Sequence, residues 1–179
     1  MNNTKKVFLL IFLSLALQLV AQISLNELKA AYIGKFTKFI EWPDSTESNK
    51  QSFIIGYYEL NDFIDVLQLS LGSSSIQGKL VEFQHIKSTE DAMNCDLIYL
   101  PDLSIKEQKR IYTYLSSEPI LTIGHTEDYA RNGVHINFYL KDGKLKFEIN
   151  PESLKRSGLK SSYLLLKLAK IVEFEGGNV

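Results

Sequence analysis

The sequence has few of the residues and motifs that carry catalysis or metal binding. Cys95 is the one cysteine in 179 residues, so the chain cannot form an internal disulfide. The three histidines, His85, His125 and His135, show no i, i+4 pair or other close metal-ligand spacing. No G-x-G-x-x-G or Walker loop is present, and Gly34-Lys35 lies inside a predicted helix. We therefore expect no catalytic residue, no cofactor and no metal site.

A strong charge of one sign is also lacking. The chain has 20 basic and 21 acidic residues, and removal of residues 1–21, which contain two lysines and no acid, leaves 18 basic residues and a net charge of −3. The lysines are interleaved with Asp and Glu, whereas nucleic-acid binding needs a clustered positive field. We predict no nucleic-acid partner.

A long hydrophobic run occurs only at the N-terminus. Lys5-Lys6 precedes fifteen mostly apolar residues, 7–21, and Ala21 is a small residue at which a signal peptidase could cut. The run is shorter than the roughly 20 apolar residues of a membrane span, and glutamines interrupt it. No cysteine follows that would carry a lipid anchor. We predict a cleaved signal peptide, residues 1–21, and one exported domain, residues 22–179.

Capping signals and hydrophobic periodicity predict alternating helices and strands. Ser24 and Glu27 form an S-x-x-E capping box at the start of a first helix that Pro43 ends by Trp42. The following strands are predicted at 53–58, 80–86, 97–100 and 120–124, with helices at 61–72, 89–93 and 104–115 between them. This alternation implies a parallel sheet with right-handed crossovers.

The last third of the chain predicts a hairpin and closing helices. Apolar residues alternate with polar ones along 134–138 and again along 145–149, and Asp142-Gly143 supplies the positive φ of a tight turn. A short helix capped by Thr126 precedes the hairpin, and helices 151–157 and 160–173 follow it. The predicted fold class is α/β, with a largely parallel sheet flanked by helices, a C-terminal β-hairpin added to the sheet and closing C-terminal helices.

Two motifs resemble catalytic sites but lack the groups that such sites need. Residues 96–102 look like the phospho-acceptor strand of a receiver domain, yet the first strand ends in Tyr57-Tyr58 where two acids should hold Mg²⁺. Ser157 to Lys160 fits S-x-x-K, but neither S-D-N nor K-T-G accompanies it. We interpret this second motif as the end of one helix at Gly158 and the start of the next. Neither motif predicts an enzyme.

Three groups of residues are candidates for binding. The first helix ends in an aromatic cluster, Phe36, Phe39 and Trp42, that fits either the core or a partner-binding patch. Helix 160–173 is apolar around more than half its circumference, so it should be buried on two sides, inside the monomer or against a second subunit of a homodimer. Finally, ligands of open α/β sheets usually bind at strand ends. The residues of such a ligand crevice would be Tyr58, Pro101 and His125.

Motifs along most of the exported chain match one known family. They are Gly133, Asn137-Phe138, Phe147 to Asn150, Gly158-Leu159 and Leu165-Leu166 in the last third, with Ala30 to Tyr32, Phe36, Phe39 and Glu41-Trp42-Pro43 upstream. With these residues the chain resembles the YfiR-like family of periplasmic regulators. The most specific parts are residues 41–43 and 147–150, and residues 60–87 match weakly.

The resemblance implies a non-catalytic periplasmic regulator. Such a protein binds and represses the periplasmic part of an inner-membrane signalling protein, typically a diguanylate cyclase that controls cyclic di-GMP and biofilm formation, and responds through an outer-membrane lipoprotein. Some family members carry disulfides, from which the lone Cys95 departs, and we expect it to be a buried thiol. The alternative is a small-ligand sensor for a membrane histidine kinase, which would use the crevice near Tyr58, Pro101 and His125.

Overall fold

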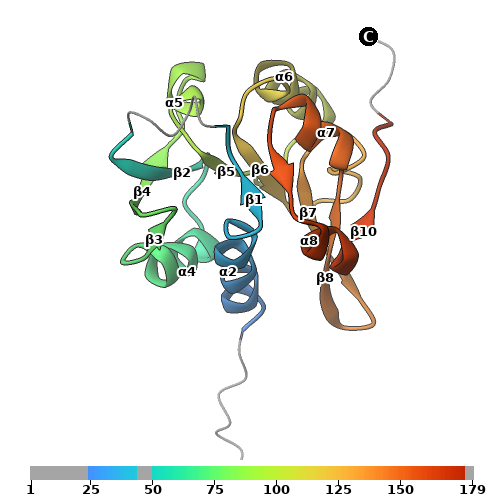
Figure 1. Ribbon diagram of the computed structural model, residues 1–179, viewed down its shortest axis with the longest axis horizontal. Coiled ribbons are helices and arrows are strands. Elements are labelled where there is room, and N and C mark those ends of the chain that lie inside the picture. Colours follow the sequence, from blue (N-terminus) through green and yellow to red (C-terminus); the bar gives the residue numbers. More distant parts are fainter. Residues whose placement is uncertain (1–23, 44–49, 176–179) are drawn as a thin grey trace, which may run out of the picture.

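The computed structural model describes residues 24–43 and 50–175, which form a curled mixed β-sheet flanked by helices (Figure 1). The predicted signal peptide, residues 1–21, lies outside the described residues. The helices are α2 (Leu25–Phe36), α4 (Asp62–Leu71), α5 (Thr89–Met93), α6 (Ile105–Leu115), α7 (Pro151–Arg156) and α8 (Tyr163–Leu168). The strands are β1 (Ile40–Glu41), β2 (Ser52–Tyr57), β3 (Ser75–Ile76), β4 (Lys79–His85), β5 (Leu97–Tyr99), β6 (Leu121–Gly124), β7 (Ile136–Lys141), β8 (Lys144–Ile149), β9 (Lys160–Ser161) and β10 (Lys170–Ile171). Within the described ranges, no helix has the length and apolar character needed to cross a membrane.

The main sheet has eight strands in the order β10-β8-β7-β6-β5-β2-β4-β3. Its centre, from β4 to β7, is parallel, and β10 is parallel to β8. However, β8 is antiparallel to β7, and β3 is antiparallel to β4. The sheet is therefore mixed, which corrects the expectation of a largely parallel sheet. The difference arises near both margins, where tight turns join successive strands, because such turns connect only antiparallel neighbours.

The β7–β8 hairpin is added to the sheet as its sequence predicts. Asp142 and Gly143 have positive φ values of 52° and 70°, as a two-residue hairpin turn requires. The register places Phe138 opposite Phe147. Both rings pack against Phe36 of α2, with centroid distances of 5.7 and 4.8 Å. The hairpin thus contributes an aromatic part of the core and holds α2 on the sheet.

Helices cover both faces of the sheet. On one face α2 and α4 pack against each other and bury Phe36, Ile64 and their apolar neighbours. On the other face, α5 and α6 lie over a second cluster that includes Ile98 and Tyr129. Figure 1 shows α2 and α4 at the bottom of the view and α5 and α6 at the top. The central strands are consequently buried on both sides, in keeping with their continuous apolar sequence.

The first helix is shorter than the sequence predicts. Its capping box is confirmed, because the Ser24 N–H donates to the Glu27 carboxylate (2.6 Å) and the Glu27 N–H donates to Ser24 Oγ (3.1 Å). The helix ends at Phe36, where the Thr37 hydroxyl donates to the Gly34 carbonyl (3.1 Å). The chain then continues as β1, which pairs with β9 in a separate two-stranded sheet. This distant pairing, which local sequence does not reveal, replaces the last predicted turns.

The predicted closing helix, residues 160–173, is replaced by β9, α8 and β10. Pairing of β9 with β1 and of β10 with β8 satisfies backbone groups that a continuous helix would have bonded internally. Ala169 already has extended backbone angles, so α8 stops at Leu168. The short helix expected after Thr126 is also absent from the described structure, in which residues 127–133 form turns.

Candidate functional site

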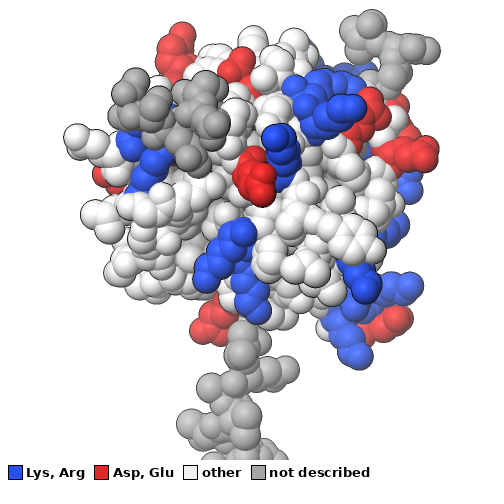
Figure 2. Space-filling model, viewed as in Figure 1, with Lys and Arg blue, Asp and Glu red and all other residues white. Residues whose placement is uncertain are grey.

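Exposed apolar side chains gather on the segment that follows the hairpin. Tyr163, Leu164 and Leu168 of α8 and Ile171 of β10 have exposed fractions of 74, 61, 75 and 50%. We call these four residues the α8 surface. Figure 2 is drawn from the side on which Figure 1 shows α8, and it shows uncharged surface there, bordered by Lys and Arg and, at its upper left, by acidic side-chain atoms. The sequence predicted a helix buried on two sides, inside the monomer or against a second subunit, and within the single chain one apolar side is open.

Hydrogen bonds on both sides of α8 fix its orientation. The Ser162 N–H donates to the Phe39 carbonyl (2.8 Å), and Ser162 Oγ accepts from the Leu165 N–H (3.3 Å). Leu165 is the helix residue whose side chain is buried in the core. After the helix, the Val172 N–H donates to the Ile149 carbonyl (3.0 Å). A short helix held at both ends with one buried side chain presents its other large apolar side chains to solvent.

The segment that carries the α8 surface is basic. Residues 155–172 contain five basic residues and no acidic residue. Lys170 pairs with Glu148 (3.1 Å) of the hairpin. Lys160 and Lys167 are exposed and have no ion pair within the part of the chain that the structure describes. An exposed apolar patch with basic margins favours an acidic protein surface as its complement.

The aromatic cluster proposed from the sequence as a partner-binding patch lies mostly in the core. Phe36 and Trp42 are buried, with exposed fractions of 1 and 7%. Trp42 packs edge-on against Phe53 (5.4 Å between centroids), and its indole N–H donates to the Asp96 carbonyl (3.3 Å). Phe39 is partly buried against the same core. The structure thus corrects the expectation for Phe36 and Trp42, since side chains buried in the monomer cannot also present a surface to a partner.

The three residues of the predicted ligand crevice do not share one hollow. Tyr58 lines a hollow of about 470 Å³ beside α5 and α6. Pro101 is buried, and its carbonyl accepts from the Tyr129 hydroxyl (2.7 Å). His125 lines two hollows on the opposite face, which contacts α2 and α4. The sheet therefore lies between Tyr58 and His125. Residues that follow strand ends can turn to either face of a sheet, and these two turn to opposite faces.

The His125 side chain lies in a polar and aromatic environment that can bind a ligand. Its Nδ1 is 2.9 Å from the Tyr99 hydroxyl, and the two rings stack with an interplanar angle of 6°. Partial burial and the nearby positive charge of Lys29 lower the pKa of His125, whereas Asp102 opposes this shift. Lys29 lines both hollows with His125. Lys29 belongs to no sequence motif, although its spacing of four residues from the buried Ile33 places it beside the inward stripe of α2.

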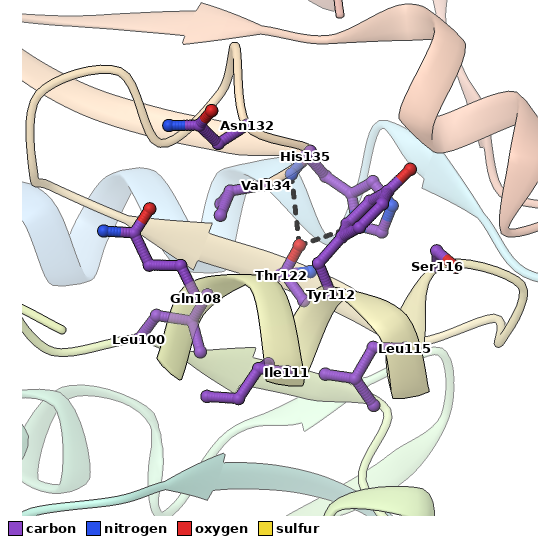
Figure 3. Close-up of a pocket in the computed structure, with 11 residues that line it drawn as sticks. Leu100, Gln108, Ile111, Tyr112, Leu115, Ser116, Thr122, Asn132, Val134 and His135 are labelled. Carbon is purple, nitrogen blue, oxygen red and sulfur yellow. Dashed lines mark hydrogen bonds between the residues drawn. The ribbon is translucent and has the colours of Figure 1, made fainter. Parts of the chain in front are cut away.

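His135 is the third histidine, and its contacts are structural. Figure 3 shows it hydrogen-bonded to Thr122 beside a cavity of about 20 Å³, which Ile111 and Tyr112 of α6 also line. The Thr122 N–H donates to His135 Nδ1 (3.0 Å), and Nε2 lies 3.2 Å from the Ser153 carbonyl, to which it donates. Complete burial lowers the pKa of His135 to about 4. The ring is therefore neutral near pH 7 and joins β6, β7 and α7.

Cys95 is a buried free thiol, as the sequence predicts. Its Sγ–H donates to the Asp91 carbonyl (3.3 Å). Burial, together with the negative charge of Asp96, raises the pKa of the thiol to about 12. Among the described residues, no group of three or more His, Cys, Asp or Glu side chains is placed to hold a metal ion. Cys95 thus has the character of a small core residue.

Comparison with known proteins identifies the family. A search of curated proteins found no match. The sequence model of a domain family described as YfiR/HmsC-like (DUF4154) matches residues 26–170, which include α2 except Leu25, the main sheet except Ile171, and α8. Proteins of this family are known as non-catalytic periplasmic regulators. The match covers most of the 179 residues, so the chain belongs to the YfiR/HmsC-like family.

Proposed function

We propose that the chain is an exported regulator that binds the periplasmic part of an inner-membrane signalling protein, such as a diguanylate cyclase, and holds it inactive. Membership of the YfiR/HmsC-like family supports this class of function. The α8 surface is the observation that carries the interaction, because four large apolar side chains remain exposed on a firmly held segment. Contiguous exposed apolar side chains of this kind mark interaction sites in soluble proteins.

The chemistry of the α8 surface specifies its occupant. Burial of a leucine or tyrosine side chain contributes about 1.5–3 kcal/mol, so a few such residues can dominate an interface. The exposed ammonium groups of Lys160 and Lys167, which form no ion pair within the described residues, would orient an acidic partner and speed its association. We assign the surface to a membrane-anchored partner whose periplasmic domain presents an apolar patch with acidic margins.

Repression follows from differential binding to two states of the partner. A regulator that binds the inactive state more tightly than the active state shifts the partner toward inactivity. Moving an equilibrium from 1:99 to 99:1 requires a preference of about 10⁴-fold for the favoured state. A third component, such as an outer-membrane lipoprotein that sequesters the regulator, would restore the output. No catalytic step by this chain is needed.

Site-specific photo-crosslinking in living cells tests the assignment of the surface. A photoreactive residue replaces Leu164 in one variant and Leu69, an exposed residue of α4, in the matched control. We expect position 164 to yield a crosslinked inner-membrane protein that mass spectrometry identifies as carrying a cyclase or kinase domain. Crosslinking of the same protein from both positions, or from position 69 alone, would contradict the assignment.

A second copy of the chain is the other occupant that an apolar helix could bind. Sedimentation of the mature protein distinguishes the two. A monomer at micromolar concentration supports a hetero-partner, whereas a dimer that Leu168→Glu dissociates and Leu69→Glu leaves intact would assign the surface to self-association.

The alternative function is a sensor that binds a small ligand and signals to a membrane histidine kinase. The paired hollows next to His125 favour it, because they lie at the strand ends where α/β sheets bind ligands. A saturable rise of the melting temperature with a small molecule would support this alternative.

A further inference from the structure

Two hollows adjoin at the carboxyl ends of β5 and β6. Their volumes are about 620 and 370 Å³, and both are lined by Lys29 and His125. The smaller hollow also contacts Phe63 and Tyr99. Residues from the first turns of α2 and α4 line it as well. We call the combined space the Lys29–His125 crevice.

Lys29 is a half-buried cation with no acidic partner among the residues that the structure describes. Its ammonium group lies 5.6 Å from the centre of the Phe63 ring, and burial lowers its pKa. The other cations of the larger hollow are paired, Arg131 with Asp128 (3.7 Å) and Lys170 with Glu148 (3.1 Å). No ion pair of Lys29 occurs within residues 24–43 and 50–175. Its desolvation is therefore uncompensated by protein, and a bound anion would compensate it.

His125 presents a fixed hydrogen-bond donor. The Tyr99 hydroxyl lies 2.9 Å from His125 Nδ1, and it donates to Nδ1 in the tautomer that carries the ring proton on Nε2. Burial and the charge of Lys29 lower the pKa of His125, which favours the neutral ring, and we assign its one ring proton to Nε2. Stacking against Tyr99 holds the plane of the ring. No hydrogen bond of Nε2 occurs within the described residues, which leaves this N–H for a ligand.

Four acidic residues also line the hollows: three of them are exposed, and the fourth, Glu148, is buried and paired with Lys170 (3.1 Å). Asp62 lies on the wall of the smaller hollow, and Glu127 and Asp128 lie on that of the larger one. Asp128 is paired with Arg131. Water screens exposed carboxylates more effectively than it screens a half-buried ammonium group. The local field next to Lys29 and His125 consequently favours an anion.

We propose that the Lys29–His125 crevice binds a small organic anion, with its carboxylate between Lys29 Nζ and His125 Nε2 and its apolar body against the rings of Phe63 and Tyr99. A carboxylate accepts hydrogen bonds from both donors, and the two aromatic rings supply an apolar wall. None of the four residues of the α8 surface lines this crevice, so the proposal goes beyond repression of a membrane partner.

Titration calorimetry of the mature protein with sodium benzoate tests the proposal, and benzyl alcohol serves as the uncharged isostere. We expect saturable binding of benzoate at millimolar concentration and none of benzyl alcohol. Lys29→Met, which keeps the length of the side chain, should weaken binding by about 10- to 100-fold, the range expected for loss of a charge-assisted hydrogen bond. The control Lys35→Met, at an exposed position of the same helix, should bind as the wild type does.

A second variant and a second measurement make the test specific. His125→Phe keeps the ring against Tyr99 but lacks the Nε2 donor, and it should also weaken binding. In the wild type, benzoate should shift the ¹⁵N resonance of His125 Nε2 and leave that of the buried His135 unchanged. Failure of benzoate to saturate, equal binding of benzyl alcohol, or unchanged binding by both Lys29→Met and His125→Phe would overturn the proposal. None of these results bears on crosslinking at the α8 surface.

Discussion

His135 should make the stability of the fold fall between pH 6.5 and pH 4. The side chain is 2% exposed, its Nδ1 accepts from the Thr122 N–H, and its Nε2–H donates to the Ser153 carbonyl. Protonation would place a positive charge in the core and turn the acceptor Nδ1 into a donor that faces another N–H. The native protein therefore resists protonation at a pH at which the unfolded chain accepts a proton freely.

The magnitude follows from the two pKa values. The pKa of His135 is about 4 in the folded protein, against an ordinary value of 6.5. Because the folded value is the lower one, the stabilisation is fully present above pH 6.5 and is lost as the pH falls toward 4. At 1.36 kcal/mol per pKa unit, the loss amounts to about 3 kcal/mol of unfolding free energy. That is a large fraction of the roughly 5–15 kcal/mol typical of a domain.

Urea denaturation at pH 7, 6, 5 and 4 measures this loss. Carboxylates titrate in the same range, so the relevant quantity is the difference between the wild type and His135→Gln. We expect His135→Gln to be less stable at pH 7 and to lose about 3 kcal/mol less than the wild type on acidification. His85→Gln, which changes an exposed histidine, should follow the wild-type curve. Parallel curves for wild type and His135→Gln would refute the assignment of the acid sensitivity to His135.

Three further predictions concern the core, the thiol and export. Phe36→Ala should cost about 3–5 kcal/mol of unfolding free energy, because the buried ring of Phe36 contacts two phenylalanines of the hairpin. Leu69→Ala, at an exposed position, should cost under about 0.5 kcal/mol. Equal urea midpoints for the two variants would contradict this prediction. Cys95 should react slowly with a thiol reagent in native protein, and Cys95→Ser should cost about 1–3 kcal/mol through a buried hydroxyl, so fast native labelling would show that the thiol is accessible. Mass spectrometry of the envelope fraction should find a mature N-terminus near Gln22, and a protein that retains Lys5 would disprove cleavage near Ala21.

Local signals predict the parts of the fold that depend on neighbouring residues. The capping box at Ser24 and the turn at Asp142-Gly143 are determined by side-chain and backbone chemistry within a few residues, and both form as predicted. The segment β9-α8-β10 is different, since its two short strands form only through pairing with β1 and β8. Its apolar run of Tyr163 to Leu166 reads as a helix in isolation, and the pairing that interrupts the helix involves residues about 120 positions away.

The candidate sites, too, could be predicted only where local sequence determines them. His125 could be placed at a strand end from the sequence, because strand ends are recognisable. The sequence does not show to which face of the sheet each strand-end side chain turns. In the structure, Tyr58 lies on the opposite face of the sheet from His125. Exposure of α8 was also unpredictable, because an apolar helix has the same sequence whether it is covered or open. Lys29 is a candidate only because the fold places it in the same two hollows as His125.

The level of cyclic di-GMP in a deletion strain, complemented by variants of the α8 surface, tests the proposed regulation most directly. Wild type and Leu69→Glu should restore the low level of cyclic di-GMP and of biofilm, whereas Leu168→Glu, at an equally exposed position of α8, should leave both high while the protein remains folded and exported. An unchanged level of cyclic di-GMP after deletion, or full complementation by Leu168→Glu, would contradict repression of a diguanylate cyclase through this surface.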